Sequence, residues 1–283
     1  MVLLNLCEIA NQNKGQEILF SESIVTSIED SIGCEISRDR VYLGSYFCGQ
    51  LFLMSDWNRI IEKSKQMFQH ATLCVPVFSE QDLDVAKRLT TTLISNSGNY
   101  IDEVSVNDFG MAQYLRESDP DLKIHFGRLL FKYPRDIRLA RYEEESFALQ
   151  HDDFVNYLQR YDLAGFEIDQ ISKNISFSEL NDDKGFCLSM HAPLCYMTTG
   201  NICKYASINK PLHLKFRPNL KCEKECSRVV ESYHVPENPE KPLYRLGRTI
   251  YFYSEGFKKL INSVDRLLYF PAFEFISECR GEK

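Results

Sequence analysis

The chain has 283 residues, of which 44% are hydrophobic and 26% are charged, a composition that is typical of a folded globular protein and excludes a disordered chain. The formal net charge of -7 excludes a general attraction to polyphosphate, so nucleic-acid binding would require a local basic patch. The opening residues contain no basic region followed by a small-residue cleavage site, and no later window approaches the about 18 uninterrupted apolar residues of a spanning helix, so we expect no signal peptide, no membrane span and a cytoplasmic location.

The first half of the chain alternates expected strands with expected helices. The opening apolar run indicates a strand, and residues 21–33 indicate a helix, because three isoleucines at helical spacing lie between Ser21 and Gly33. Further strands are expected at 41–48, 71–78, 102–106, 122–126 and 164–168, and further helices at 55–68, 80–93, 108–116 and 153–161. This order predicts parallel strands joined by right-handed crossovers. At this length we expect an α/β fold, a single TIM-like (β/α) barrel domain spanning residues 1–283.

The alternation breaks down after about residue 170. Strands are expected at 175–177, 186–190, 243–253 and 266–269, and one further helix at 255–263. The barrel is therefore expected to be irregular in its second half.

Half of the ten cysteines lie in about a seventh of the chain. They are Cys187, Cys195, Cys203, Cys222 and Cys226, with 18 residues between Cys203 and the closing CEKEC pair. In a reducing compartment, thiols favour metal binding or catalysis over disulfides. Cysteine also packs as an ordinary core residue, but five together in a loop-rich stretch favour metal ligation by a subset. We expect a cysteine-rich insertion at about 187–230 that covers the C-terminal face of the barrel.

Other polar residues at expected strand ends have two interpretations each. Asn107 and Asp108 can contact substrate or cap the following helix. His125 faces the barrel mouth or the core, and His191 is a candidate for supporting a metal site. Glu167 and Asp169 share one strand face and suit either paired carboxylates or salt bridges.

The chain has one candidate basic cluster, formed by five residues: Lys204, Lys210, Lys215, Arg217 and Lys221. A nucleic-acid partner would have to use this cluster. We interpret it as a solvated face.

Three stretches resemble a known family. They are VYLGSYFC at 41–48, SVNDFGMAQYL at 105–115, and HAPLCYMTTGNICKYAS with KCEKEC between 191 and 226. They resemble the collagenase-like peptidases, family thirty-two of unassigned catalytic type, with weaker support from IHFGRLLFKYPRDIRLARY at 124–142. The similarity runs from about residue 40 to about 230 and is nearest to the iron-sulfur branch that takes part in oxygen-independent hydroxylation during ubiquinone synthesis. Relatives of that branch hydroxylate RNA bases.

The resemblance implies a 4Fe-4S cluster held by Cys48, Cys203, Cys222 and Cys226. Two departures from the family pattern are a longer segment between Cys203 and Cys222 and the extra Cys195, which is an alternative ligand. Four thiolates also suit zinc, and spacing alone does not choose between the two metals.

The function implied is oxygen-independent hydroxylation of a small aromatic quinone precursor or a nucleobase, with a paralogous subunit as partner in a heterodimer. Asn107, Asp108, His125 and His191 are candidate substrate contacts. One alternative is a peptidase, although no nucleophile elbow, HExxH or paired-aspartate signature occurs. Another is a zinc-stabilised interaction protein without catalytic activity.

Overall fold

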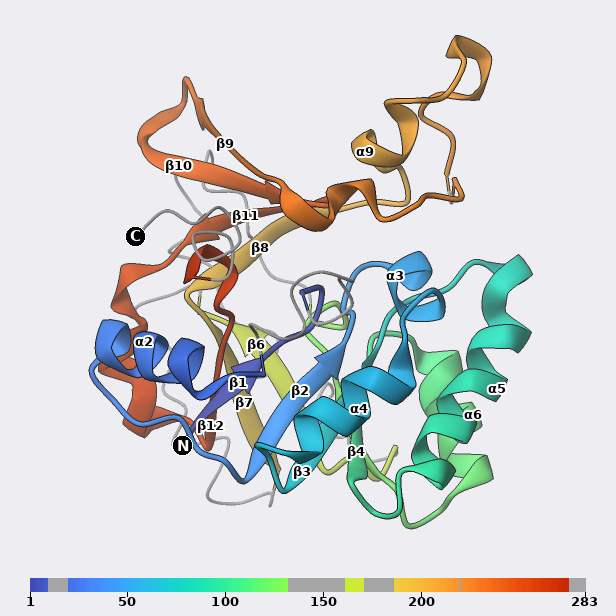
Figure 1. Ribbon diagram of the computed structural model, residues 1–283, viewed down its shortest axis with the longest axis vertical. Helices are drawn as coiled ribbons and strands as arrows, with labels where there is room; N and C mark the ends of the chain where they lie inside the picture. The colour runs from blue at the N-terminus through green and yellow to red at the C-terminus, as the bar shows by residue number, and fades with distance from the viewer. Residues whose placement is uncertain (10–19, 132–160, 171–185, 219, 275–283) are drawn as a thin grey trace.

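The computed structural model describes residues 1–9, 20–131, 161–170, 186–218 and 220–274 (Figure 1). The helix expected at 153–161 and the strand expected at 175–177 fall wholly or almost wholly outside these residues, as does Cys279. Within the described residues, no helix combines the length and the apolar character needed to cross a membrane.

Eight parallel strands close into a barrel, which confirms the predicted fold class. Each strand pairs with the next along the chain, and the last pairs with both the first and the seventh barrel strand. The strands are β1 (Val2–Asn5), β2 (Arg40–Gly44), β3 (His70–Val75), β4 (Ile101–Val106), β5 (Lys123–Phe126), β6 (Gly165–Asp169), β7 (Cys187–Ala192) and β12 (Arg266–Tyr269). Their residues are almost all buried, as expected where helices cover the outside of a parallel sheet.

The helices of the first half are α2 (Glu22–Ile32), α3 (Gly49–Leu53), α4 (Trp57–Lys65), α5 (Glu80–Asn96) and α6 (Phe109–Ser118). Four of them lie where the sequence predicts a helix, and the short helix α3 was not predicted. Local signals fix their ends. Asp56 caps α4 by accepting a hydrogen bond from the Arg59 amide at 3.3 Å, and α2 ends at Gly33, whose φ of 72° places it in the left-handed region.

A second sheet lies beyond the end of the barrel toward which β2 points (Figure 1). It is antiparallel, with the order β8-β11-β10-β9, and consists of β8 (Leu194–Thr199), β9 (Val230–Val235), β10 (Asn238–Leu246) and β11 (Thr249–Tyr253). The prediction of one strand over 243–253 was wrong, because Gly247, with φ of 58°, turns the chain into a hairpin. The segment expected as a helix at 255–263 is the 3-10 helix η4 (Glu255–Ser263).

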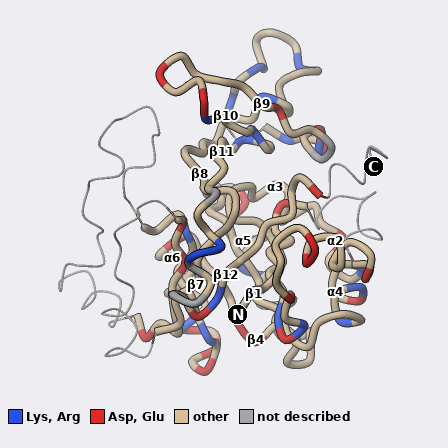
Figure 2. Tube along the Cα trace, turned by 90° about the vertical axis from the view of Figure 1, so that its left-hand side faces the viewer, with Lys and Arg blue, Asp and Glu red and all other residues tan. Residues whose placement is uncertain are grey.

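The chain between β8 and β9 projects from the molecule. It contains the short helices α9 (Lys204–Ser207), η2 (Leu212–Leu214) and η3 (Glu225–Arg228). We call residues 202–221 the arm. The expected insertion at 187–230 therefore contains two regular strands, β7 and β8, before the irregular part begins. Acidic and basic residues are spread around the barrel in Figure 2.

Candidate metal centre

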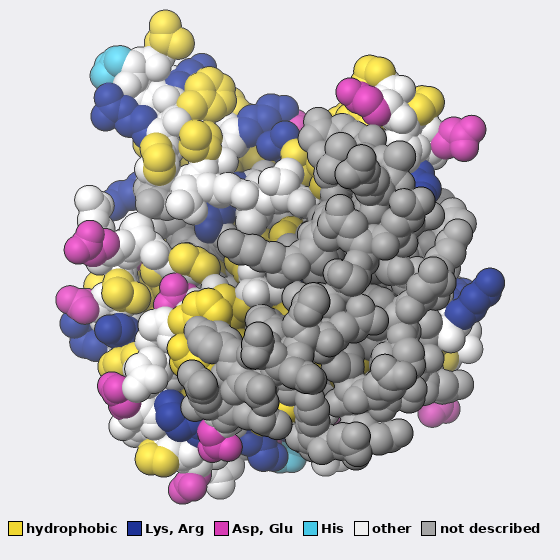
Figure 3. All heavy atoms as spheres, turned by 180° about the vertical axis from the view of Figure 1, so that it is seen from behind, with side chains coloured by type: hydrophobic (Ala, Val, Ile, Leu, Met, Phe, Trp, Pro, Cys, Tyr) yellow, Lys and Arg dark blue, Asp and Glu magenta, His cyan; other side chains and the backbone are white. Residues whose placement is uncertain are grey.

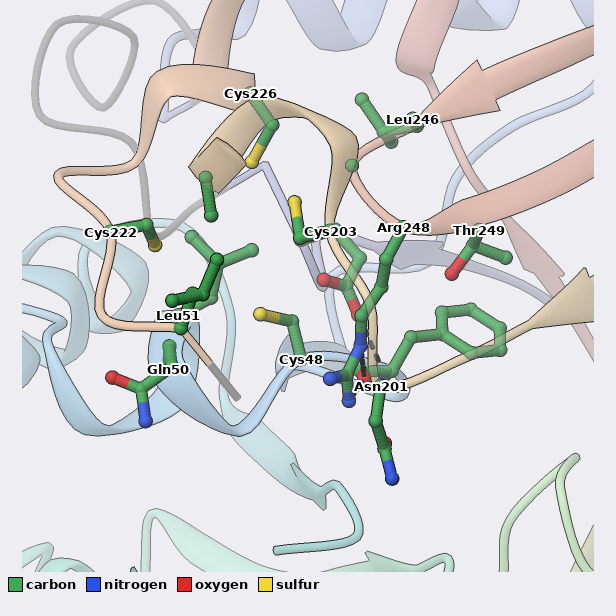
Figure 4. A pocket seen from close by; sticks show the side chains of 15 residues that line it. Cys48, Gln50, Leu51, Asn201, Cys203, Cys222, Cys226, Leu246, Arg248 and Thr249 are labelled. Atoms are coloured by element: carbon green, nitrogen blue, oxygen red, sulfur yellow. Dashed lines mark hydrogen bonds between the residues drawn. The ribbon is translucent and has the colours of Figure 1, made fainter. Parts of the chain in front are cut away.

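Four cysteines line one pocket at the C-terminal end of the barrel. They are Cys48, Cys203, Cys222 and Cys226. Figure 4 shows their side chains directed toward a common space. The pocket brings together cysteines that are up to 178 positions apart in the chain, from both the barrel and the segment that covers it.

Cys48 belongs to a turn after a barrel strand. The prediction of a strand reaching residue 48 was wrong, because β2 ends at Gly44 and Cys48 is the residue before α3. Glu8 holds this turn: its Oε1 accepts hydrogen bonds from the Ser45 hydroxyl at 2.7 Å, the Tyr46 amide at 2.7 Å and the Phe47 amide at 3.1 Å. The Cys48 amide in turn donates to the Ser45 Oγ at 2.8 Å. The buried carboxylate thereby fixes the backbone that carries the Cys48 thiol.

The other three cysteines come from the irregular segment above the barrel. Cys203 precedes α9, and its carbonyl accepts a hydrogen bond from the Ser207 hydroxyl at 2.9 Å. Cys226 lies in η3, and Lys224 between the closing pair has a left-handed φ of 63°. This turn reverses the chain and lets Cys222 and Cys226 face the same pocket.

Burial raises the pKa of the Cys48 thiol to about 11. Burial also raises the pKa of Cys226 well above its usual range, and negative charge on the other three cysteines would raise it further. Thiols in this environment keep their protons unless a cation compensates the thiolate charge. Metal binding at this pocket would therefore release protons.

The four thiols do not form a recognisable site for a single metal ion. Among the described residues, no group of three or more His, Cys, Asp or Glu side chains is placed so that it could hold one metal ion. A tetrahedral zinc needs all of its sulfurs about 2.3 Å from one point.

A cation from the second sheet borders the pocket. Arg248, in the turn between β10 and β11, donates two hydrogen bonds to the Phe47 carbonyl, one from Nε at 2.5 Å and one from Nη2. Figure 4 shows its guanidinium near Cys48. Arg248 places positive charge next to the thiols and joins the second sheet to the Cys48 turn.

The two charged residues that line the pocket, Glu8 and Arg248, were not among the predicted site residues. Glu8 shortly follows the C-terminal end of the first barrel strand, where barrel sites are built, so its position was a usable signal. Arg248 lies in a hairpin turn whose partner is 201 residues away in the sequence. No local pattern identifies such a contact.

The other candidate ligand is placed elsewhere. Cys195 is buried in β8, and its thiol donates to the Gln170 carbonyl at 3.1 Å. It does not line the pocket of the four cysteines.

The candidate substrate residues also lie outside this pocket. Asn107 donates to the Val75 carbonyl at 3.2 Å, and Asp108 caps α6 by accepting from the Met111 amide at 2.8 Å. His125 is buried, 3.7 Å from the Glu103 carboxylate. His191 is buried against Glu167. Their role in substrate binding stays a prediction.

The two carboxylates of β6 are both paired, as one of the two interpretations expected. Asp169 forms a buried ion pair with Arg128, and Glu167 Oε2 is 2.8 Å from His191 Nε2. Both carboxylates point into the barrel core.

Comparisons of the chain with protein-family models, curated proteins and solved structures gave no significant match.

Proposed function

We propose that the chain is an iron-sulfur protein of the collagenase-like peptidase type and takes part in oxygen-independent hydroxylation of a small aromatic quinone precursor or a nucleobase. The observation that carries this proposal is the convergence of Cys48, Cys203, Cys222 and Cys226 on one pocket at the C-terminal end of the barrel. Barrel enzymes place their active sites at this end. The same four residues are the ligand set implied by the sequence resemblance.

The choice of a cluster over a single zinc ion follows the sequence resemblance. In a 4Fe-4S cluster each cysteine binds a different iron, so the four sulfurs stand farther apart than around one zinc. Four thiols line the pocket, which is the number that either metal centre needs. A bound cluster would supply one-electron transfer.

The chain's own residues would tune and enclose such a cluster. Arg248 brings a positive charge toward the thiolates. A positive charge near a cluster stabilises the reduced form and therefore raises the reduction potential of the cluster. Glu8 fixes the Cys48 turn through three hydrogen bonds. Leu51, Leu220 and Leu246 line the pocket and limit the access of water. A paralogous subunit would complete the substrate site in the heterodimer that we propose.

Anaerobic purification followed by iron and acid-labile sulfide analysis tests the proposal. We expect about four irons and four sulfides per chain together with a broad absorbance band from thiolate-to-iron charge transfer. Replacement of any one pocket cysteine, for example Cys48→Ser or Cys222→Ser, should lower the iron content several-fold and weaken that band. Cys34→Ser is the matched control, because Cys34 is a partly buried free cysteine outside the pocket.

Stoichiometric zinc without sulfide would instead identify the zinc-stabilised interaction protein. A colourless protein that binds neither metal after anaerobic preparation would contradict the proposal. Iron binding that is unchanged in Cys48→Ser and Cys222→Ser would contradict the ligand assignment.

A further inference from the structure

The arm exposes an unusual concentration of apolar side chains. Ten large hydrophobic residues are exposed among the described residues. Four of them lie in the arm, in a stretch of 15 positions: Ile202 (49% exposed), Ile208 (53%), Leu212 (86%) and Phe216 (58%). Leu212 is the most exposed of all ten. Grouped exposed apolar residues mark an interaction surface, whereas single ones need no explanation.

All charged residues of the arm are basic. The arm contains Lys204, Lys210, Lys215, Arg217 and Lys221 and no Asp or Glu. Lys204 is paired with Glu231 at 2.6 Å, but within the described part of the chain Lys210, Lys215 and Arg217 form no ion pair. Because the whole chain carries -7 and the arm carries +5, the remainder carries -12. The charge of the arm is therefore opposite to that of the rest of the chain.

A hydrogen bond within the arm holds the projecting loop that carries these residues. The Ser207 hydroxyl accepts a hydrogen bond from the Phe216 amide at 3.0 Å, which closes the segment that carries Leu212 at its tip. Both ends of the arm line the pocket, at Cys203 and Leu220. Figure 1 shows the segment around α9 projecting away from the barrel, and Figure 3 shows hydrophobic and Lys/Arg side chains together on the projection at the upper left.

We propose that the arm binds the surface of an anionic lipid bilayer, with Leu212 and Phe216 inserted at the level of the headgroups and Lys210, Lys215 and Arg217 bound to lipid phosphates. Apolar tip residues with basic residues beside them form the combination that binds such interfaces. A convex tip suits a bilayer, which needs no shape-complementary cleft, whereas a protein partner would have to bury about 1,000 Å² or more. The -12 charge on the remainder repels the same membrane, so the chain approaches it with the arm first.

Co-sedimentation of the full chain with lipid vesicles tests this proposal. We expect binding to vesicles of phosphatidylcholine mixed with phosphatidylglycerol, much weaker binding to phosphatidylcholine alone, and weaker binding as salt rises. Leu212→Ser and Phe216→Ser should each reduce the affinity about 10-fold, through lost burial of an apolar side chain. The double variant Lys215→Gln and Arg217→Gln should reduce it about 30-fold on the mixed vesicles only.

Val85→Ser is the matched control, because Val85 is 50% exposed on α5, which belongs to the barrel. It should bind vesicles like the unchanged chain, and circular dichroism should show that all variants are folded. Failure to bind mixed vesicles, or equal binding by the Leu212→Ser and control variants, overturns the proposal. Self-association, or binding of single-stranded RNA, that depends on Leu212 in the absence of vesicle binding assigns the arm to that partner instead.

The membrane proposal goes beyond the proposed function and is tested separately from it. Iron and sulfide are measured on the same samples. A metal-free chain that binds mixed vesicles supports the arm and counts against the cluster, whereas an iron-loaded chain that ignores vesicles overturns the arm proposal alone.

Discussion

Glu167 is a buried carboxylate at the centre of the barrel whose pKa differs from its ordinary value. Burial raises its pKa from 4.5 to about 7, and this shift is opposed by the nearby hydroxyls of Ser105 and Tyr46 and by the charge of Arg128. Its Oε2 is 2.8 Å from His191 Nε2. Asn5 accepts from the Cys7 amide with its Oδ1, so its amide nitrogen donates to His191 Nδ1 and the ring proton lies on Nε2, facing Glu167.

This pKa predicts a particular dependence of stability on pH. Because the folded chain holds a proton on Glu167 that the unfolded chain releases above about pH 4.5, the free energy of unfolding should fall by roughly 3 kcal/mol as pH rises from 4.5 through 7. Glu167→Gln should remove most of this slope. Urea unfolding at pH values between 5 and 8 measures it, and Glu22→Gln, on a side chain that is 70% exposed, is the control. An equal slope in Glu167→Gln and the unchanged chain would contradict the assignment.

Which individual residues form the pocket was only partly predictable. The cysteines could be chosen because their spacing and the resemblance select them among ten. Glu8 and Arg248 were not found, because their roles depend on contacts with residues 45–47 that sequence periodicity does not encode. Asp108 illustrates the reverse case, since its cap on α6 is a local interaction and was one of the two interpretations that the sequence allowed.

At the scale of elements, the junction between β2 and the Cys48 turn depends on Gly44. Its φ is 125°, and a Cβ atom at this position would lie 2.2 Å from the Cys74 carbonyl oxygen in the neighbouring strand. No side-chain rotation relieves a clash with backbone. Gly44→Ala should therefore lower the free energy of unfolding by roughly 3 kcal/mol and also reduce iron binding, because Cys48 follows four residues later.

Gly33→Ala provides the comparison. Gly33 also has a left-handed φ, 72°, but nothing lies within 4 Å of the added methyl group. We expect a loss of about 1 kcal/mol and unchanged iron content. Urea unfolding and iron analysis of the two variants measure both effects, and equal losses of stability would show that the contact with Cys74 is relieved by movement of the strands.

The elements of the barrel were predictable and those of the second sheet were not, for a physical reason. Buried parallel strands are short apolar runs between amphipathic helices, and both signals are local. β10, by contrast, contains Pro239 and Pro242 and a bulge between Asn238 and Leu243. Proline within a run argues against a strand, so the sheet is recognisable only from its long-range pairing.

At the scale of the whole molecule, the pocket joins the barrel to the layer above it. Cys48 belongs to the barrel side, whereas Cys203, Cys222 and Cys226 belong to the segment between β8 and β9. The described protein contacts across this junction include the hydrogen bonds from Arg248 to the Phe47 carbonyl and the packing of Phe47 against Tyr196 and Tyr251. A cluster bound by all four thiols would add a covalent connection between the two layers.

This connection predicts that metal removal uncouples the layers. Trp57, the single tryptophan, packs on Phe52 at 5.0 Å between ring centroids and reports the barrel near Cys48, whereas far-UV circular dichroism reports both layers. With metal bound, the two signals should give one urea midpoint. After chelation under anaerobic conditions, the dichroism transition should begin about 1 M urea earlier than the fluorescence transition, because roughly 3 kcal/mol of linkage is lost from the upper layer.

In Cys48→Ser, which lacks the barrel-side ligand, chelation should leave the separation between the two midpoints unchanged. Coincident midpoints before and after chelation of the unchanged chain would mean that protein contacts alone make the two layers one cooperative unit.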